Sequence, residues 1–298
     1  MMRIANAPCS WGVLEFELEG QAAGYRRVLD EIRDTGYEGT ELGDWGFMPT
    51  EPEILDAELG GRGLALLGAF VPVDFSDRGA HQPGAVRAVR TARLLAAVAA
   101  TPVVVLADEN GKDPVRTRHA GRITPGQGLD EAGWRAFAEG VEAVAREVLD
   151  ATGVRSVFHH HCAGFVETPA EVESLMRRTD PELVGLCFDT GHYAFGGGDP
   201  IDGIRRHADR IRHVHFKDHD PVIAALVEDS GWDYFEAVRR GIFCELGRGA
   251  VDFPGVLREL DWIGYKGWIV VEQDVLPGLG SPAESAGRNR AFLRDLGL

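Results

Sequence analysis

The feature that most constrains the fold is a regular alternation of short apolar runs with longer helical segments. The runs are rich in β-branched residues, and a helical pattern of about 10 to 20 residues follows each of them. Such alternation is typical of βα units arranged around a parallel sheet. The predicted strands are residues 3–8, 39–43, 64–70, 102–108, 155–161, 184–190, 211–218 and 267–274.

Helical segments occupy the intervals between these runs. Several of them begin after Thr, Asp or Ser and end at Gly, as helix caps require. The predicted helices are residues 24–36, 52–63, 85–100, 131–153, 169–178, 200–210, 253–264 and 282–297. Eight βα units in 298 residues predict a (β/α)8 TIM barrel. A doubly wound open sheet is the alternative, but neither GxGxxG nor a P-loop follows the first run.

The chain has no linker or break in composition, which predicts a single domain over residues 1–298. Three stretches that follow predicted strands are longer than a usual βα loop, namely 74–84, 109–128 and about 219–250. In a barrel, all three would overhang the C-terminal face, where active sites form.

Charge and cysteine usage limit the partners. The 31 Lys and Arg against 47 Asp and Glu give 31 − 47 = −16, which repels nucleic acid and anionic membranes. No apolar run is long enough to cross a bilayer. The four cysteines have no CxxC spacing and the chain opens without a signal-peptide pattern, so we expect a cytoplasmic protein. The last helix and the stretch near 219–250 could serve a homo-oligomer.

The stretch VFHHHCAGFVET (157–168) ends one predicted strand with three histidines. Alternation along a strand places His159 and His161 on one face and His160 on the other. Other predicted strands also end in metal-ligand types: Glu41, Asp44, Asp108, Glu109, Asp189, His192, His213, His215, Lys217, Glu272 and Asp274. One such Asp is usually a helix cap, and one such His is usually a core residue. So many together in a barrel mouth are costly to bury unless they are paired or bind a metal.

Four segments resemble a known superfamily. They are FDTGH (188–192), RIRHVHFKD (210–218), ELGRGAVDFPGVL (245–257) and GWIVVEQD (267–274). They are similar to the xylose-isomerase-like TIM barrels, which include sugar isomerases, epimerases and endonuclease IV. Residues 157–192 resemble the myo-inosose (2-keto-myo-inositol) dehydratase branch. The N-terminal half matches loosely, through Ala7, Pro8 and Trp11.

The resemblance implies one divalent ion, commonly Mn, Co or Mg, with Zn as a further option, held by side chains from strands five to eight. Asp189, His215 and Glu272 match three of the family's ligands. The usual strand-five Glu is absent, and His159 stands nearest its place. His161 and Glu167 remain alternatives for that position.

The activity implied by the resemblance is dehydration of a cyclic keto-polyol in inositol catabolism, through an enediolate. His161 and His192 are expected to serve as base and acid in an unassigned order, and Lys217 to hold a substrate oxygen. Glu41, Trp11 and Glu167 are expected to contact the substrate. Because no phosphate-binding loop is present, a small unphosphorylated polyol or sugar is expected.

Three alternatives remain open. A ketose isomerase or epimerase would use the same site with carboxylates on strands five and eight. Dehydroshikimate dehydratase is a further relative that would use the same kind of site. A nuclease of the endonuclease IV type is disfavoured by the charge of −16. A non-catalytic sugar-binding barrel would be favoured if no metal were bound.

Overall fold

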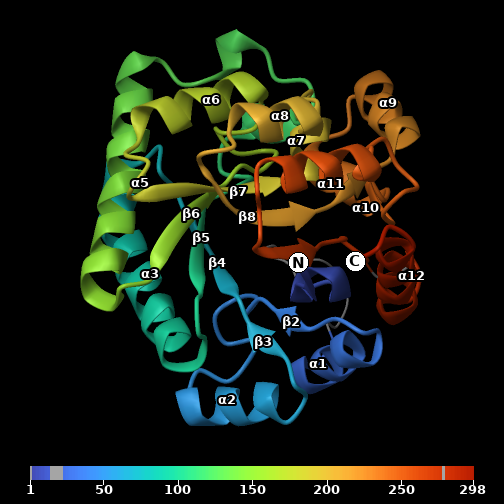
Figure 1. Ribbon diagram of the computed structural model, residues 1–298. Helices are drawn as coiled ribbons and strands as arrows, with labels where there is room; N and C mark the ends of the chain where they lie inside the picture. The colour runs from blue at the N-terminus through green and yellow to red at the C-terminus, as the bar shows by residue number, and fades with distance from the viewer. Residues whose placement is uncertain (1, 14–22, 277–278) are drawn as a thin grey trace.

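The eight predicted strands form one parallel sheet that closes into a barrel (Figure 1). The structure is a computed structural model, and it describes residues 2–13, 23–276 and 279–298. The strand order is β3-β2-β1-β11-β8-β7-β6-β5-β4. The strands are β1 (Arg3–Asn6), β2 (Gly39–Thr40), β3 (Ala65–Leu66), β4 (Gly68–Val73), β5 (Val103–Asp108), β6 (Arg155–His159), β7 (Val184–Asp189), β8 (Ile211–Phe216) and β11 (Trp268–Val271). The predicted TIM barrel is confirmed.

The predicted strand 64–70 is divided in two, and the division closes the barrel. β3 pairs with β2 and β4 pairs with β5. The junction between β3 and β4 is hydrogen-bonded to the strands on both sides. Leu42 N, just after β2, donates to Gly68 O, and Val103 N, at the start of β5, donates to Leu67 O. Gly68 permits this change of partner, because a Cβ there would lie only 2.8 Å from the Val103 carbonyl oxygen.

Helices surround the barrel, with α3 and α5 side by side on one flank and α12 near the chain ends (Figure 1). The outer helices are α1 (Tyr25–Asp34), α2 (Pro52–Gly60), α3 (Arg78–Val98), α5 (Glu131–Thr152), α6 (Pro169–Arg178), α8 (Pro200–Arg206), α11 (Phe253–Trp262) and α12 (Pro282–Asp295). In the described ranges, no helix combines the length and the apolar character needed to cross a bilayer.

The predicted long loops contain secondary structure of their own. Helix α3 begins at Arg78, inside the stretch 74–84, because the Asp77 side chain caps it by accepting a hydrogen bond from Gly79 N. The other elements are α4 (Pro114–His119), α7 (Thr190–Phe195), α9 (Pro221–Ser230), α10 (Tyr234–Arg239), the 3-10 turns Pro8–Trp11 and Pro125–Gln127, and the antiparallel pair β9 (Asp218–His219) and β10 (Phe243–Cys244).

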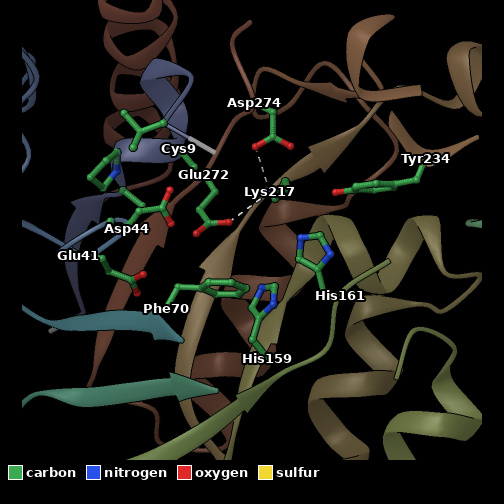
Figure 2. A pocket seen from close by; sticks show the side chains of 14 residues that line it. Cys9, Glu41, Asp44, Phe70, His159, His161, Lys217, Tyr234, Glu272 and Asp274 are labelled. Carbon is green, nitrogen blue, oxygen red and sulfur yellow. Dashed lines mark hydrogen bonds and ion pairs between the residues drawn. The ribbon is translucent and has the colours of Figure 1, made fainter. Parts of the chain in front are cut away.

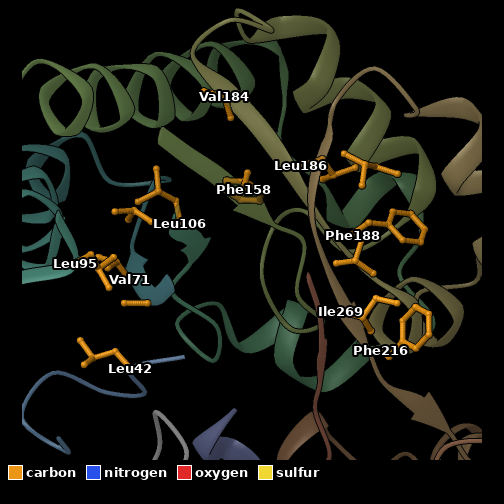
Figure 3. Close-up of a cluster of buried hydrophobic side chains, with 14 of the residues drawn as sticks. Leu42, Val71, Leu95, Leu106, Phe158, Val184, Leu186, Phe188, Phe216 and Ile269 are labelled. Atoms are coloured by element: carbon orange, nitrogen blue, oxygen red, sulfur yellow. The ribbon is translucent and has the colours of Figure 1, made fainter. Parts of the chain in front are cut away.

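The main core lies between the sheet and the helices. Leu106 on β5, Phe158 on β6 and Phe188 on β7 point outward into this layer, where Leu95 of α3 belongs to the same buried cluster (Figure 3). Burying one large apolar side chain stabilises the fold by about 2 kcal/mol. The many buried side chains of this layer therefore hold the strands in register. The inward faces of the same strands are thereby free to carry polar groups.

Candidate functional site

A pocket opens at the C-terminal ends of the strands (Figure 2). The space inside and in front of it amounts to about 600 Å³, open solvent at its mouth included. Residues from both halves of the chain line it: Ala7, Pro8, Cys9, Val13, Glu41, Gly43, Asp44, Phe70, His159, His161, Lys217, Tyr234, Glu272 and Asp274.

Four buried side chains converge beside the pocket, and two of them, His159 and Glu272, also line it. One potential ligand atom from each of His159, Asp189, His215 and Glu272 lies within 4.8 Å of the others. His159 Nε2 is 3.6 Å from Asp189 Oδ2, and His215 Nδ1 is 3.9 Å from Asp189 Oδ2 and 3.2 Å from Glu272 Oε1. Ligands at about 2.0 to 2.2 Å from a shared ion stand about 3 to 4 Å apart, so this spacing suits one divalent cation.

The hydrogen-bonding state of these atoms also fits a cation. His159 Nε2, Asp189 Oδ2 and His215 Nδ1 are buried, and none of the described residues is placed to form a hydrogen bond with them. Buried polar atoms normally have partners, so three such atoms facing one point fit a bound cation. Burial, with His215 next, lowers the pKa of His159 to about 3, which leaves its ring neutral as a metal ligand must be. Two imidazole nitrogens and two carboxylates are ligand types that divalent metal ions accept.

Local structure presents Asp189 to this group. The residue ends β7 and caps α7, because its Oδ1 accepts a 2.7 Å hydrogen bond from His192 N. The other oxygen is thereby turned toward the cluster. Gly191 is needed beside it, because a Cβ at that position would lie 2.8 Å from the Lys217 backbone carbon and side chain. The DTGH sequence is thus both a helix cap and a close contact with β8.

His161 lines the pocket just beyond the end of β6. Its Nδ1 lies 2.8 Å from the Cys162 carbonyl oxygen and 3.3 Å from Asn110 Nδ2. Because the carbonyl can only accept, the shorter contact places the ring proton on Nδ1. Its Nε2 therefore carries the lone pair. Burial, followed by His159, lowers the pKa of His161 to about 3, so the ring is neutral near pH 7. His161 can accept a proton.

Lys217 is the cation of the pocket. Its ammonium lies 3.2 Å from Glu272 Oε2 and 3.5 Å from Asp274 Oδ1 (Figure 2). It also stands over the Phe243 ring. Burial lowers the pKa of Lys217, but Asp274, Glu272 and Asp189 outweigh it and raise the pKa well above the usual value. The group stays protonated and can hold or protonate a substrate oxygen.

Glu41 reaches the pocket from the residue after β2. Its Oε1 accepts hydrogen bonds from His213 Nε2 at 2.7 Å and from His215 Nε2 at 3.0 Å. The residue was expected to contact substrate, and it does line the pocket. One of its oxygens is, however, committed to the two histidines of β8.

Two further histidines, His160 and His192, lie beside the pocket without lining it. His160 faces the helix layer, as alternation predicts: its ring contacts Phe188 and Tyr193, and its Nε2 accepts a hydrogen bond from Asp189 N. His192 lies behind the pocket wall, with its Nε2 3.4 Å from Lys217 Nζ and its ring 4.0 Å from that of His161. His192, which was expected to act as base or acid, is not among the described lining residues, but it contacts His161 and Lys217, which are. Its catalytic role stays a prediction.

The structure does not bring Trp11 or Glu167 into the pocket. The Trp11 indole is buried in the main core and donates a 2.6 Å hydrogen bond to Glu31. The Glu167 carboxylate accepts hydrogen bonds from Gly121 N at 2.6 Å and Ala163 N at 2.8 Å, and so holds two loops together. Neither residue is among the described residues that line the pocket, so their expected contact with substrate stays a prediction. Local pattern does not reveal which neighbours a side chain meets.

Other lining residues had no role assigned from the sequence. Asp44 and Asp274 were noted among the polar residues at strand ends, and both line the pocket. Phe70 lies on β4, and Cys9 follows β1. Tyr234 belongs to α10 in the long β8–α11 connection, and its side chain reaches into the pocket (Figure 2). No local signal marks it.

Comparison with known proteins identifies the family. The model of the xylose isomerase-like TIM barrel matches residues 29–296. An inosose dehydratase of Geobacillus kaustophilus is 33% identical over 94% of this chain and 90% of its own length. The chain belongs to the xylose isomerase-like TIM barrel family, which confirms the resemblance seen in the sequence.

Solved structures agree with the fold. The "probable 3-DHS dehydratase" of Bacillus anthracis superposes with a TM-score of 0.72 at 14% identity, covering 99% of each chain. An L-ribulose 3-epimerase superposes with a TM-score of 0.70 at 20% identity, covering 99% of this chain and 94% of the other. At these identities the likeness concerns the fold alone.

Proposed function

We propose that the protein is a metal-dependent hydro-lyase that removes water from a neutral cyclic keto-polyol such as 2-keto-myo-inositol. The observation that carries this proposal is the convergence, in one pocket, of a four-ligand group with a neutral His161 and a protonated Lys217. The inosose dehydratase name of relatives at about 30% identity supports the substrate.

The charge of the pocket supports a neutral substrate. Four carboxylates line it, on Glu41, Asp44, Glu272 and Asp274, against the single ammonium of Lys217, and no arginine is among the described lining residues. A carboxylate or phosphate on the substrate would face net repulsion, whereas hydroxyl groups can donate hydrogen bonds to carboxylates. We therefore favour a polyol over the anionic dehydroshikimate, and over a sugar phosphate.

His159, Asp189, His215 and Glu272 would hold the metal, in agreement with the buried atoms of the first three that lack a hydrogen-bond partner among the described residues. When bound, a divalent cation polarises a substrate carbonyl and so acidifies the neighbouring C–H bond. His161 Nε2 accepts that proton. The C–H electron pair forms a C=C bond, the adjacent C–O bond breaks, and the oxygen leaves as water with a proton from the Lys217 ammonium.

The strand-five residue favours dehydration over isomerisation. An isomerase or epimerase of this kind moves a proton between carbons with carboxylates on strands five and eight, but β6, the fifth strand of the barrel, ends in His159. The site then has a carboxylate at Glu272 and an imidazole opposite it. One basic group and one acidic group beside the metal ligands suit elimination.

The test is an ultraviolet-absorbance assay for the enone-type product from 2-keto-myo-inositol, with Mn²⁺ or Co²⁺ added to metal-stripped protein. We expect product only with metal, and a turnover about 10² to 10⁴ lower in His161→Gln with Co²⁺ binding retained. The matched control is His119→Gln, at the end of α4 and outside the pocket.

Each contrary outcome identifies the part that fails. Unchanged turnover in His161→Gln would remove that residue from the chemistry. Metal binding with an epimerised or isomerised product and no enone would favour the isomerase alternative. A preference for dehydroshikimate over the neutral ketone would contradict the charge argument.

A further inference from the structure

Glu41 makes a contact that substrate binding does not explain. Its carboxylate reaches from the end of β2 to β8, although β1 and β11 lie between these two strands in the sheet. We propose that Glu41 is a positioning residue that fixes the ring of His215 so that Nδ1 faces the ligand group. This inference rests on the proposed metal centre and assigns a role to a side chain outside it.

The distances distinguish a hydrogen-bonded group from a second metal site. Glu41 Oε1 lies 2.7 Å from His213 Nε2 and 3.0 Å from His215 Nε2, which are ordinary lengths for charge-assisted hydrogen bonds. The contacts within the proposed metal group are longer, at 3.2 to 3.9 Å. Although Glu41, His213 and His215 could in principle share an ion, their spacing favours direct contact.

The contact decides which nitrogen of His215 can bind metal. A carboxylate oxygen only accepts, so His215 Nε2 must carry a proton toward Glu41. When the ring is neutral, as a metal ligand must be, the lone pair belongs to Nδ1, the atom that faces Asp189 and Glu272. A carboxylate that accepts from the second nitrogen of a ligating histidine also fixes the orientation of the ring.

Burial makes this arrangement specific. Glu41, His213 and His215 are 3%, 4% and 1% exposed, so water has little access to replace the carboxylate. His213 donates to the same oxygen as His215 and thereby holds the Glu41 side chain in place. The metal group is built on β6, β7, β8 and the end of β11, and through Glu41 it also depends on β2, on the other side of β1.

The first experiment measures Co²⁺ affinity by titration of the metal-stripped protein. We expect Glu41→Leu to weaken binding about 10- to 100-fold, the usual effect of removing the partner of a ligating histidine. Glu41→Gln should recover part of this loss, because its amide oxygen still accepts a hydrogen bond. The control is Asp44→Asn, which removes a pocket carboxylate with no contact to His215 and should change affinity by less than about threefold.

The second experiment observes the ring directly, in the Zn²⁺-loaded protein with ¹⁵N-labelled histidine. We expect the His215 Nε2 proton to exchange slowly in the unchanged protein and to be lost to exchange in Glu41→Leu. If Glu41→Leu does not fold, the comparison of Glu41→Gln with Asp44→Asn decides.

Equal Co²⁺ affinity in the unchanged protein and both Glu41 variants would overturn the inference and leave the proposed function intact. Equal losses in Glu41→Gln and Asp44→Asn would also overturn it, because charge rather than position would then be the cause. Absence of Co²⁺ binding in the unchanged protein would overturn the metal centre itself, and with it the role of Glu41.

Discussion

The buried ion pair between Arg116 and Glu171 offers the sharpest test of how the pocket wall is held. Arg116 on α4 is fully buried, and its guanidinium donates to both Glu171 oxygens at 2.7 and 2.9 Å. It also donates at 2.7 Å to the carbonyl of Gly164, in the loop that follows His161. Glu171 Oε2 in turn accepts from Thr168 N at the start of α6.

We expect Glu171→Ala to lower the free energy of unfolding by about 4 to 6 kcal/mol. Leaving a buried guanidinium unpaired costs about 3 to 5 kcal/mol. Loss of the acceptor at the start of α6 adds about 1 kcal/mol. The matched control is the exposed pair of Arg178 with Glu131, also at the start of a helix, where Glu131→Ala should cost less than about 1 kcal/mol.

Urea unfolding followed by circular dichroism measures both variants. The double variant Arg116→Met with Glu171→Leu should recover part of the lost free energy, because no buried charge is then left unpaired. If Glu171→Ala loses no more stability than Glu131→Ala, or if the double variant is less stable than Glu171→Ala, the reasoning about the buried charge is refuted.

Three further predictions concern the site and its surroundings. Gly191→Ala should lower the free energy of unfolding by about 1 to 3 kcal/mol and lower turnover, because the new Cβ would collide with Lys217. Urea unfolding and the enone assay measure the two effects, and unchanged values would contradict the contact. Chelation should abolish turnover and Mn²⁺ or Co²⁺ should restore it, whereas Glu272→Gln should stay inactive at metal levels that saturate the unchanged protein. Burial raises the pKa of Asp108 to about 7, so the stability that its protonated form contributes is complete below the unfolded pKa near 4 and is lost as pH rises through about 7. The unfolding free energy of the unchanged protein should therefore fall relative to that of Asp108→Asn from about pH 4 to about pH 8, and a constant difference would contradict this assignment.

The sequence determined the barrel and the broad location of its site. Alternating runs and local caps are short-range features, so α6 begins and ends where predicted, with Thr168, Pro169 and Glu171 supplying its cap. Parallel strands bring their C-terminal ends to one face whatever the details of packing, and this is why Asp189, His215 and Glu272 could be expected to meet. The period of two likewise separated His159 and His161 from His160.

The tertiary structure decided which partner each polar side chain found. Glu41 meets His215 across two intervening strands, Trp11 turns to Glu31, and Glu167 turns to backbone N–H groups of two loops. A strand pattern gives the face and the end at which a residue lies. The neighbours of that residue depend on barrel closure and on the path of long connections, such as the one that delivers Tyr234, and these are set by packing between segments far apart in the chain.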